Sequence, residues 1–522
     1  MKKLLVIIAV VAAFAGCGDK IPGTFSESAD LPRIYPDYTN VTIPVNMAPL
    51  TFLADGRSEA IVARLTSGEE EVVCGGSKIQ PDADDWRRLV ESAMSASDSC
   101  KAVKVEVYIK DNGQWTRFKP FNIYVSPDSI DPYISYRLIA PSYVTYEDLT
   151  ISQRCLENYD ESVIYDNMLC TEPTSGQCIN CHNYQNYNPN RMQFHARQNQ
   201  GGTIIACDGK IRKINMASDS ILSAGVYPAW HPWLNLIVYS TNKTFQTFHI
   251  TNPDKIEVFD TQSDLIAYDV EHNEVTNIEN DPLEFEVFPC WAPDGKSLYY
   301  CSAHYEYQDD IDPGLELVHR FSEVKYNIYR KSFDPETLEF GPRELVFDAV
   351  SMDKSATLPR VSPDGRWLLF TLAKYGVFHV WHRDADLWMA PLFPLDEKAD
   401  SLSDPSVAQG GSLKMARPLE ELNSPDVESY HSWSSNGRWV VFSSRRYDGN
   451  FTRPFFAHID KDGRGAKPFE LPCADPDYHR QFMRSYNIPE FMRGPVTIRP
   501  QAFADVLKGD GERVKYVGQL EK

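Results

Sequence analysis

Hydrophobic and polar residues alternate in a repeated frame through the second half of the chain. The frame occurs four times, as YPAWHPWLNLIVYSTN, FPCWAPDGKSLYYCSA, LPRVSPDGRWLLFTLA and YHSWSSNGRWVVFSSR. Its apolar anchors are Trp230, Trp291, Val361 and Trp433. A tight turn follows each anchor, as at Pro363 and Gly365, and an apolar strand follows the turn. Because proline and glycine suit such turns, each copy predicts a β-hairpin.

The anchors lie 61, 70 and 72 residues apart, with another short strand after each hairpin. Four antiparallel strands per recurrence are typical of a β-propeller, whose blades need about 40–45 residues each. Residues 201–480 therefore predict a propeller of about six blades. The fold class that we expect is mainly β.

The remaining sequence divides by composition. Residues 34–125 contain short strand-like runs around a helical stretch, and Val103, Val105 and Val107 alternate as in a half-buried strand. They predict a small β-sandwich-like domain. The other expected parts are a leader (1–16), a polar tether (17–33), an irregular linker segment (126–200) and a C-terminal extension (481–522).

The charge of the chain limits its partners. It has 522 residues and a formal net charge of −21. A strongly acidic protein without a basic stripe is a poor partner for nucleic acid or for anionic lipid. Neither is expected to bind it through charge.

The N-terminus reads MKKLLVIIAVVAAFAGC, with two lysines, a short apolar run and a small residue before Cys17. The run is too short to span a bilayer and suits a signal peptide. The segment resembles a bacterial lipobox, which implies lipidation of Cys17 and anchoring to a membrane. Gly18 follows, so the resemblance implies the outer membrane, on its periplasmic face or at the cell surface. An ordinary secretory signal with a chance cysteine is the alternative.

The strongest chemical motif is C-x-x-C-H, formed by Cys178, Cys181 and His182. From composition alone, such a match arises by chance in roughly half a per cent of chains like this one. Two thiols about one helical turn apart can form thioethers to haem, and the next residue can then place an imidazole on the iron. A leader that exports the chain favours this chemistry.

A sixth iron ligand is expected close by in the sequence. Met192 and His195 are the candidates, with Met192 raising the reduction potential and His195 lowering it. Tyr184, Tyr187 and Phe194 could supply apolar cover. A five-coordinate iron is the remaining possibility.

The repeats resemble those of TolB-type β-propellers, and the C-x-x-C-H motif resembles that of c-type cytochromes. Together with the leader, they look like propeller lipoproteins of Bacteroidetes that carry a cytochrome c motif. The resemblance implies covalent haem c at Cys178 and Cys181, with His182 as axial iron ligand. It implies an electron-transfer or other redox role, with the propeller as docking surface for a protein partner.

Other interpretations stay open. In one, the protein is a binding module without redox function, and a Cys178–Cys181 disulfide staples a loop. In another, the haem is a peroxidase-like centre with an open distal face. In a further one, the motif binds zinc, which would need a fourth ligand. Of the remaining cysteines, sequence proximity suggests the pairs Cys74–Cys100 and Cys155–Cys170. Because no hydrolase motif occurs, electron transfer or binding is favoured over hydrolysis.

Overall fold

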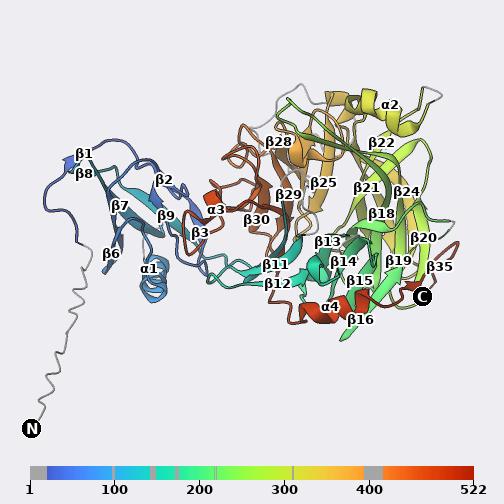
Figure 1. Cartoon of the computed structure of the whole chain (residues 1–522), viewed down its shortest axis with the longest axis horizontal. Coiled ribbons are helices and arrows are strands. Elements are labelled where there is room, and N and C mark those ends of the chain that lie inside the picture. Colours follow the sequence, from blue (N-terminus) through green and yellow to red (C-terminus); the bar gives the residue numbers. More distant parts are fainter. Residues whose placement is uncertain are drawn as a thin grey trace, which may run out of the picture.

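The computed structural model describes residues 20–96, 100–140, 148–170, 176–216, 218, 220–308, 311–392 and 415–521. The predicted leader and Cys17 lie outside these residues. The fold is mainly β, with an N-terminal domain beside a larger ring of sheets (Figure 1). Within the described ranges, no helix has both the length and the hydrophobicity needed to cross a membrane.

The N-terminal domain is built on one mixed sheet. Its strands are β1 (Ser26–Glu27), β3 (Thr42–Pro44), β5 (Ala60–Ser67), β6 (Glu70–Gly76), β7 (Ala102–Asp111), β8 (Gln114–Arg117) and β9 (Phe121–Ser126). A separate pair joins β2 (Ile34–Tyr35) to β4 (Leu53–Ala54). Helix α1 (Ala83–Ser95) begins after Asp82, whose side chain accepts the N–H of Asp84, and it buries Trp86 and Leu89 in the domain core. The helix therefore covers the sheet that the alternating valines predict.

The ring consists of six successive groups of four strands, distributed over five hydrogen-bonded sheets. The first group is β33 (Ser485–Met492) with β10 (Tyr133–Ile139), β11 (Thr150–Cys155) and β12 (Glu161–Asp166), and the second is β13 (Gln177–Tyr184), β14 (Met192–Gln198), β15 (Gly202–Cys207) and β16 (Lys210–Asn215). The third is β17 (Gly225–Trp230), β18 (Leu236–Phe248), β19 (Ile256–Asp269) and β20 (Glu274–Glu279), and the fourth is β21 (Glu284–Trp291), β22 (Ser297–His304), β23 (Asn327–Asp334) and β24 (Glu339–Phe347). The fifth is β25 (Ser355–Val361), β26 (Trp367–Ala373), β27 (Asp386–Pro391) and β28 (Arg417–Pro418), and the sixth is β29 (Glu428–Trp433), β30 (Trp439–Ser444), β31 (Arg453–His458) and β32 (Phe469–Glu470).

Within each group the neighbouring strands are antiparallel, which is the arrangement of a propeller blade. One parallel pair, Ser263 with Phe285, joins the third and fourth groups into a single sheet. Short strands β34 (Glu512–Arg513) and β35 (Lys515–Tyr516) extend two of the sheets at their edges. The predicted mainly β fold with a propeller is thus confirmed.

The segment from 126 to 200, expected to be irregular, instead contains five strands, β10 to β14. Strand β33, from the expected C-terminal extension, pairs with β10 and so closes the ring. The propeller therefore begins at β10 and is completed beyond residue 480. One of the five strands, β11, is buried at every position, so its sequence lacks the alternation of a half-exposed strand.

Three short helices lie outside the sheets of the ring. They are α2 (Pro313–Arg320), α3 (Tyr478–Gln481) and α4 (Pro500–Leu507). Helix α3 lies between the N-terminal domain and the propeller (Figure 1), and Arg480 on it pairs with Asp55 at 2.6 Å. One hydrophobic cluster runs through this junction, from Trp86 in the domain to Trp439 and Phe456 in the last blade.

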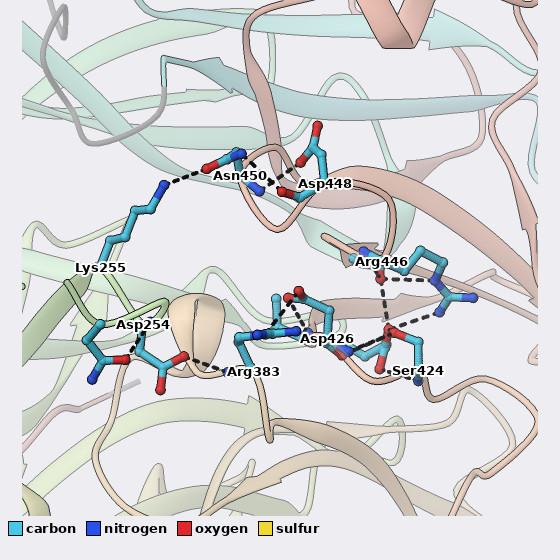
Figure 2. A network of polar contacts seen from close by, with 12 residues as sticks. Asp254, Lys255, Arg383, Ser424, Asp426, Arg446, Asp448 and Asn450 are labelled. Atoms are coloured by element: carbon cyan, nitrogen blue, oxygen red, sulfur yellow. Dashed lines mark hydrogen bonds and ion pairs between the residues drawn. The ribbon is translucent and has the colours of Figure 1, made fainter.

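The β18–β19 hairpin is much longer than the others and reaches across to distant blades. Lys255 beside its tip donates to Oδ1 of Asn450 at 2.6 Å, and Asp254 accepts the backbone N–H of Arg383 at 3.1 Å (Figure 2). Arg383 in turn pairs with Asp426 at 3.3 Å. This extension thereby ties the third blade to the fifth and sixth.

Candidate functional site

The innermost strands of all six blades carry the same local distortion. In each, the pairing register shifts at a bulge, and one residue there has a left-handed backbone with φ between 46° and 57°. These residues are Cys181, Tyr227, Phe288, Leu358, Tyr430 and Ile488. The residue after each is proline or histidine, and the residue two positions after that is aromatic in five blades and valine in the sixth. A sixfold repeat of this kind places equivalent side chains around the propeller axis.

The bulges surround a small cavity of about 40 Å³ on the axis. All six left-handed residues line it, together with His182, Asn183, Arg360 and Glu490. Beside it lies a larger cavity of about 420 Å³, which shares Asn183, Arg360 and Glu490 with the first. The two form one channel along the axis, and the larger part falls within the size range of ligand pockets.

Six equivalent residues surround the larger cavity or adjoin it at its rim. They are Tyr184, Trp230, Trp291, Val361, Trp433 and Phe491. Four of these are the anchors of the sequence repeat, so the pattern that specifies blade packing also builds the wall of the channel. Trp233, 53% exposed, adds an aromatic ring at the open side.

The opposite end of the channel is covered by the β18–β19 hairpin. Ile256 packs there against Val380, Trp381, Tyr430 and Ile488, and two of these are bulge residues that line the small cavity. The contacts at the hairpin tip hold it in this place (Figure 2). The channel is therefore open on the side of the tryptophans and covered on the other.

Several buried polar atoms in the channel wall have no hydrogen-bond partner. They include both ring nitrogens of His182, Oδ1 of Asn183 and Nε1 of Trp230. His182 is 1% exposed, and its ring faces the backbone of Ser135 on β10 and of Ile488 on β33 without closing a hydrogen bond to either. Burial, with a smaller effect of Arg137, lowers the pKa of His182 to about 3, so its imidazole is neutral.

An ion pair crosses the channel wall. Arg360 on β25 donates to Oε1 of Glu490 on β33 at 2.9 Å. Burial raises the pKa of Glu490, although Arg360 opposes the shift. Each of the two side chains therefore supplies the other with a partner of opposite charge in an otherwise apolar wall. Arg493 lies outside this pair and stacks over Tyr187 at the rim.

The C-x-x-C-H sequence occupies strand β13, and its last two residues form the bulge of that blade. Cys181 is the left-handed residue, and His182 takes the position held by Pro228, Pro289, Pro359, His431 and Pro489 in the other blades. Cys178 pairs with Arg197 on β14 and is half-buried. The motif is thus a variant of the blade repeat.

The candidate distal ligands do not join His182. Met192 is fully buried in the cluster between the first two blades, beside Tyr184. His195 lies three residues further along β14, so it faces the other side of that strand, where its Nδ1 lies 3.1 Å from the hydroxyl of Thr203. Within the described part of the chain, no three His, Cys, Asp or Glu side chains gather as metal ligands would.

A covalent haem does not fit the motif as it lies in this fold. Haem c requires both thiols and the imidazole around one porphyrin. The sulfur of Cys181 lies against the backbone N–H of Tyr227 on β17, whereas His182 faces β10 and β33 on the other side of β13. The cavity of about 40 Å³ that Cys181 and His182 line is also far smaller than a porphyrin. Covalent haem at this motif therefore stays a prediction, and the positions of Cys181 and His182 do not support it.

Two proposed disulfides are corrected. Cys178 and Cys181 are not bonded to each other, and neither are Cys155 and Cys170. Cys155 ends β11 beside its turn into β12, while Cys170 follows the far end of β12, with its thiol 3.7 Å from the carbonyl of Ala504. Six-residue strands separate the two positions by roughly 20 Å, far beyond the reach of a disulfide.

No protein-family model and no curated protein sequence matches the chain. Among solved structures, it is similar to TolB from Acinetobacter baumannii, with a TM-score of 0.40 and 12% identity over 78% of this chain and 85% of that one. Prolyl oligopeptidase B from Galerina marginata gives 0.33 and 10% identity, covering 59% and 39% of the two chains. A DUF4784 family protein from Bacteroides caccae gives 0.28 and 8%, covering 86% and 98%. At these scores the propeller assignment rests on strand topology.

Sequence reasoning missed the channel and two of the six repeats. The missed copies are NCHNY around Cys181 and NIPEF around Ile488, which lack both the tryptophan and the Asp-Gly turn. The signal that could have found them is an apolar residue followed by proline or histidine, present in all six. Aligning on that pair would have assigned His182 to a blade.

Proposed function

We propose that the protein is an envelope binding protein without a redox cofactor, and that its binding site is the propeller channel. The leader supports the envelope location, and lipidation of Cys17 would anchor the protein to the membrane. The observation that carries the proposal is the set of unpartnered polar atoms in the wall, on His182, Asn183 and Trp230. Buried polar groups in native proteins nearly always have partners, so these atoms are available to a ligand.

The wall also defines the chemistry of that ligand. Asn183 offers a carbonyl acceptor, Trp230 an N–H donor and neutral His182 one of each. A ligand that satisfies them carries both donors and acceptors, as hydroxyl or amide groups do. The aromatic residues at the open side suit its apolar face, and the cavity of about 420 Å³ sets its size. We therefore infer a small, uncharged molecule bearing several hydroxyl or amide groups.

A titration of disaccharides and of dipeptide amides, followed by tryptophan fluorescence and by calorimetry, tests this function. At least one compound should bind saturably to the wild-type protein. Asn183→Leu should weaken its binding by at least about tenfold, the cost of a lost buried hydrogen bond.

Asn190→Leu is the matched control, because Asn190 is exposed in a turn outside the channel. Its affinity should equal that of the wild type. Failure of every compound to bind, or equal losses in the two variants, would remove the channel as the site.

A further inference from the structure

A second cluster of reactive groups lies at the junction of the N-terminal domain and the propeller. Sγ of Cys473 lies 3.5 Å from Nε2 of His479, and Nδ1 of His479 lies 2.5 Å from Oε1 of Glu470. The three residues are 7%, 3% and 1% exposed, respectively. A thiol that contacts an imidazole, which in turn contacts an orienting carboxylate, has the elements of an activated nucleophile.

A buried cation strengthens this arrangement independently. Arg154 on β11 is 4% exposed, its Nε has no hydrogen-bond partner, and its Nη2 donates to the carbonyl of Pro472 at 2.8 Å. Burial disfavours its charge, but the negative potential of Cys473, followed by that of Tyr136 and Glu161, leaves its pKa raised. Positive charge of this kind near a cysteine favours the reaction of its sulfur with oxidants.

The groups that face His479 come from every neighbouring element. The ring partners are Glu470 on β32, Cys473 before α3, and Tyr486 on β33, whose hydroxyl lies 3.2 Å from Nε2. Arg453 on β31 donates to the backbone carbonyl of His479 at 2.7 Å. Burial disfavours the charged ring, yet Cys473 and Glu470 outweigh it and raise the pKa of His479 to about 9. The ring is therefore protonated at neutral pH.

We propose that Cys473 is a site of oxidation by peroxides, and that His479 and Glu470 are positioning residues that place a proton donor and positive charge beside its sulfur. The sulfur attacks one oxygen of hydrogen peroxide, an S–O bond forms and the O–O bond breaks. The departing oxygen takes the proton from Nε2 of His479 and leaves as water. Sulfur loses two electrons, the peroxide gains two, and Cys473 becomes a sulfenic acid.

Oxidation at this position acts on the junction between the domains. Thr51 of the N-terminal domain donates to the carbonyl of Cys473 at 2.5 Å, and Asp475 pairs with Lys78 of that domain at 3.4 Å. The loop of Cys473 is thus a clasp that holds the domain to the last blade. An added oxygen in its packed interior loosens this contact.

The test treats the full chain with less than one equivalent of hydrogen peroxide in the presence of dimedone, which traps sulfenic acids. Mass spectrometry then measures the adduct at each cysteine. The adduct should form first at Cys473, at a rate that changes less than about twofold between pH 6 and 8. A model thiol with a pKa near 8.5 should react roughly 70-fold faster over the same interval.

His479→Gln should lower the rate at pH 6 by at least about tenfold and restore the pH dependence of an ordinary thiol. Tyr486→Phe keeps the ring partners and should retain the wild-type rate. If His479→Gln does not fold, the pH profile of the wild-type protein decides by itself. Adducts at other cysteines before Cys473, or a wild-type profile like that of the model thiol, would overturn the proposal.

Discussion

Two buried histidines, His182 in the channel and His479 in the clasp, differ in their hydrogen-bond partners and in their pKa. His182 has no hydrogen-bond partner at either nitrogen, and burial lowers its pKa to about 3. His479 lies between Cys473 and Glu470, which overcome burial and raise its pKa to about 9. Burial alone keeps a histidine neutral, whereas burial with two acidic partners keeps it charged.

The two histidine sites also support two kinds of chemistry. A neutral imidazole with unpartnered nitrogens can donate and accept hydrogen bonds, as a binding wall requires. A charged imidazole with an orienting carboxylate can stabilise a thiolate, as a reactive cysteine requires. The conspicuous C-x-x-C-H motif holds the first kind, and an inconspicuous stretch from 470 to 479 holds the second.

The largest expected effect comes from removing the charge of the clasp. His479→Gln leaves the buried Glu470 without its cation, so the free energy of unfolding should fall by about 3–5 kcal/mol. Urea denaturation followed by fluorescence measures this loss. The double variant His479→Gln with Glu470→Gln should recover most of it, because the buried carboxylate is removed together with its cation. Equal losses in the single and double variants would show that the charge pair is not the cause.

The pH dependence of stability should separate the two histidines in opposite directions. For His182 the folded pKa of about 3 lies below the unfolded value, so its contribution is complete above about pH 6.5 and is lost as the pH falls. Between pH 7 and 5 this loss is about 2 kcal/mol. For His479 the folded pKa of about 9 lies above the unfolded value, so its contribution is complete below about pH 6.5 and is lost as the pH rises towards 9.

Urea denaturation at pH 5, 7 and 9 checks both directions. His182→Pro should lose about 2 kcal/mol less than the wild type between pH 7 and 5. His479→Gln should lose less than the wild type between pH 7 and 9. Identical pH profiles for the variants and the wild type would remove the contrast between the two sites.

The smallest expected effect concerns the bulge that holds His182. Proline inside a strand usually disrupts the sheet, but four of the six equivalent positions already carry proline. His182→Pro should therefore change the free energy of unfolding at pH 7 by less than about 1 kcal/mol. Ile179→Pro, on the same strand and paired with Ala196, should cost about 3 kcal/mol or more. A similar cost at both positions would contradict the sixfold equivalence.

The sequence predicted the propeller because four repeats carried strong turn and anchor signals. It did not predict that the ring begins at β10 and closes through β33, because strands buried on both faces show no alternation. The same weakness hid β11 within the segment 126–200, for which the sequence predicted no elements. The C-x-x-C-H motif in that segment was interpreted as two thiols one helical turn apart. In the structure it lies on strand β13.

The clasp could not be predicted from the sequence. Glu470, Cys473 and His479 lie within ten residues, but their spacing matches no known catalytic motif. Their chemistry depends on how the loop before α3 folds between two domains, and on Arg154, which comes from a strand more than 300 residues earlier. Only tertiary structure brings these groups together.

Cys178, Cys181 and His182 all belong to a blade strand, and Cys181 and His182 also line the channel. The intact mass of protein matured with a cytochrome c assembly system, read together with its pyridine haemochrome spectrum, tests this most directly. We expect the mass of the polypeptide without haem and no haemochrome band. An added haem mass that disappears in the Cys178→Ala, Cys181→Ala double variant would contradict it.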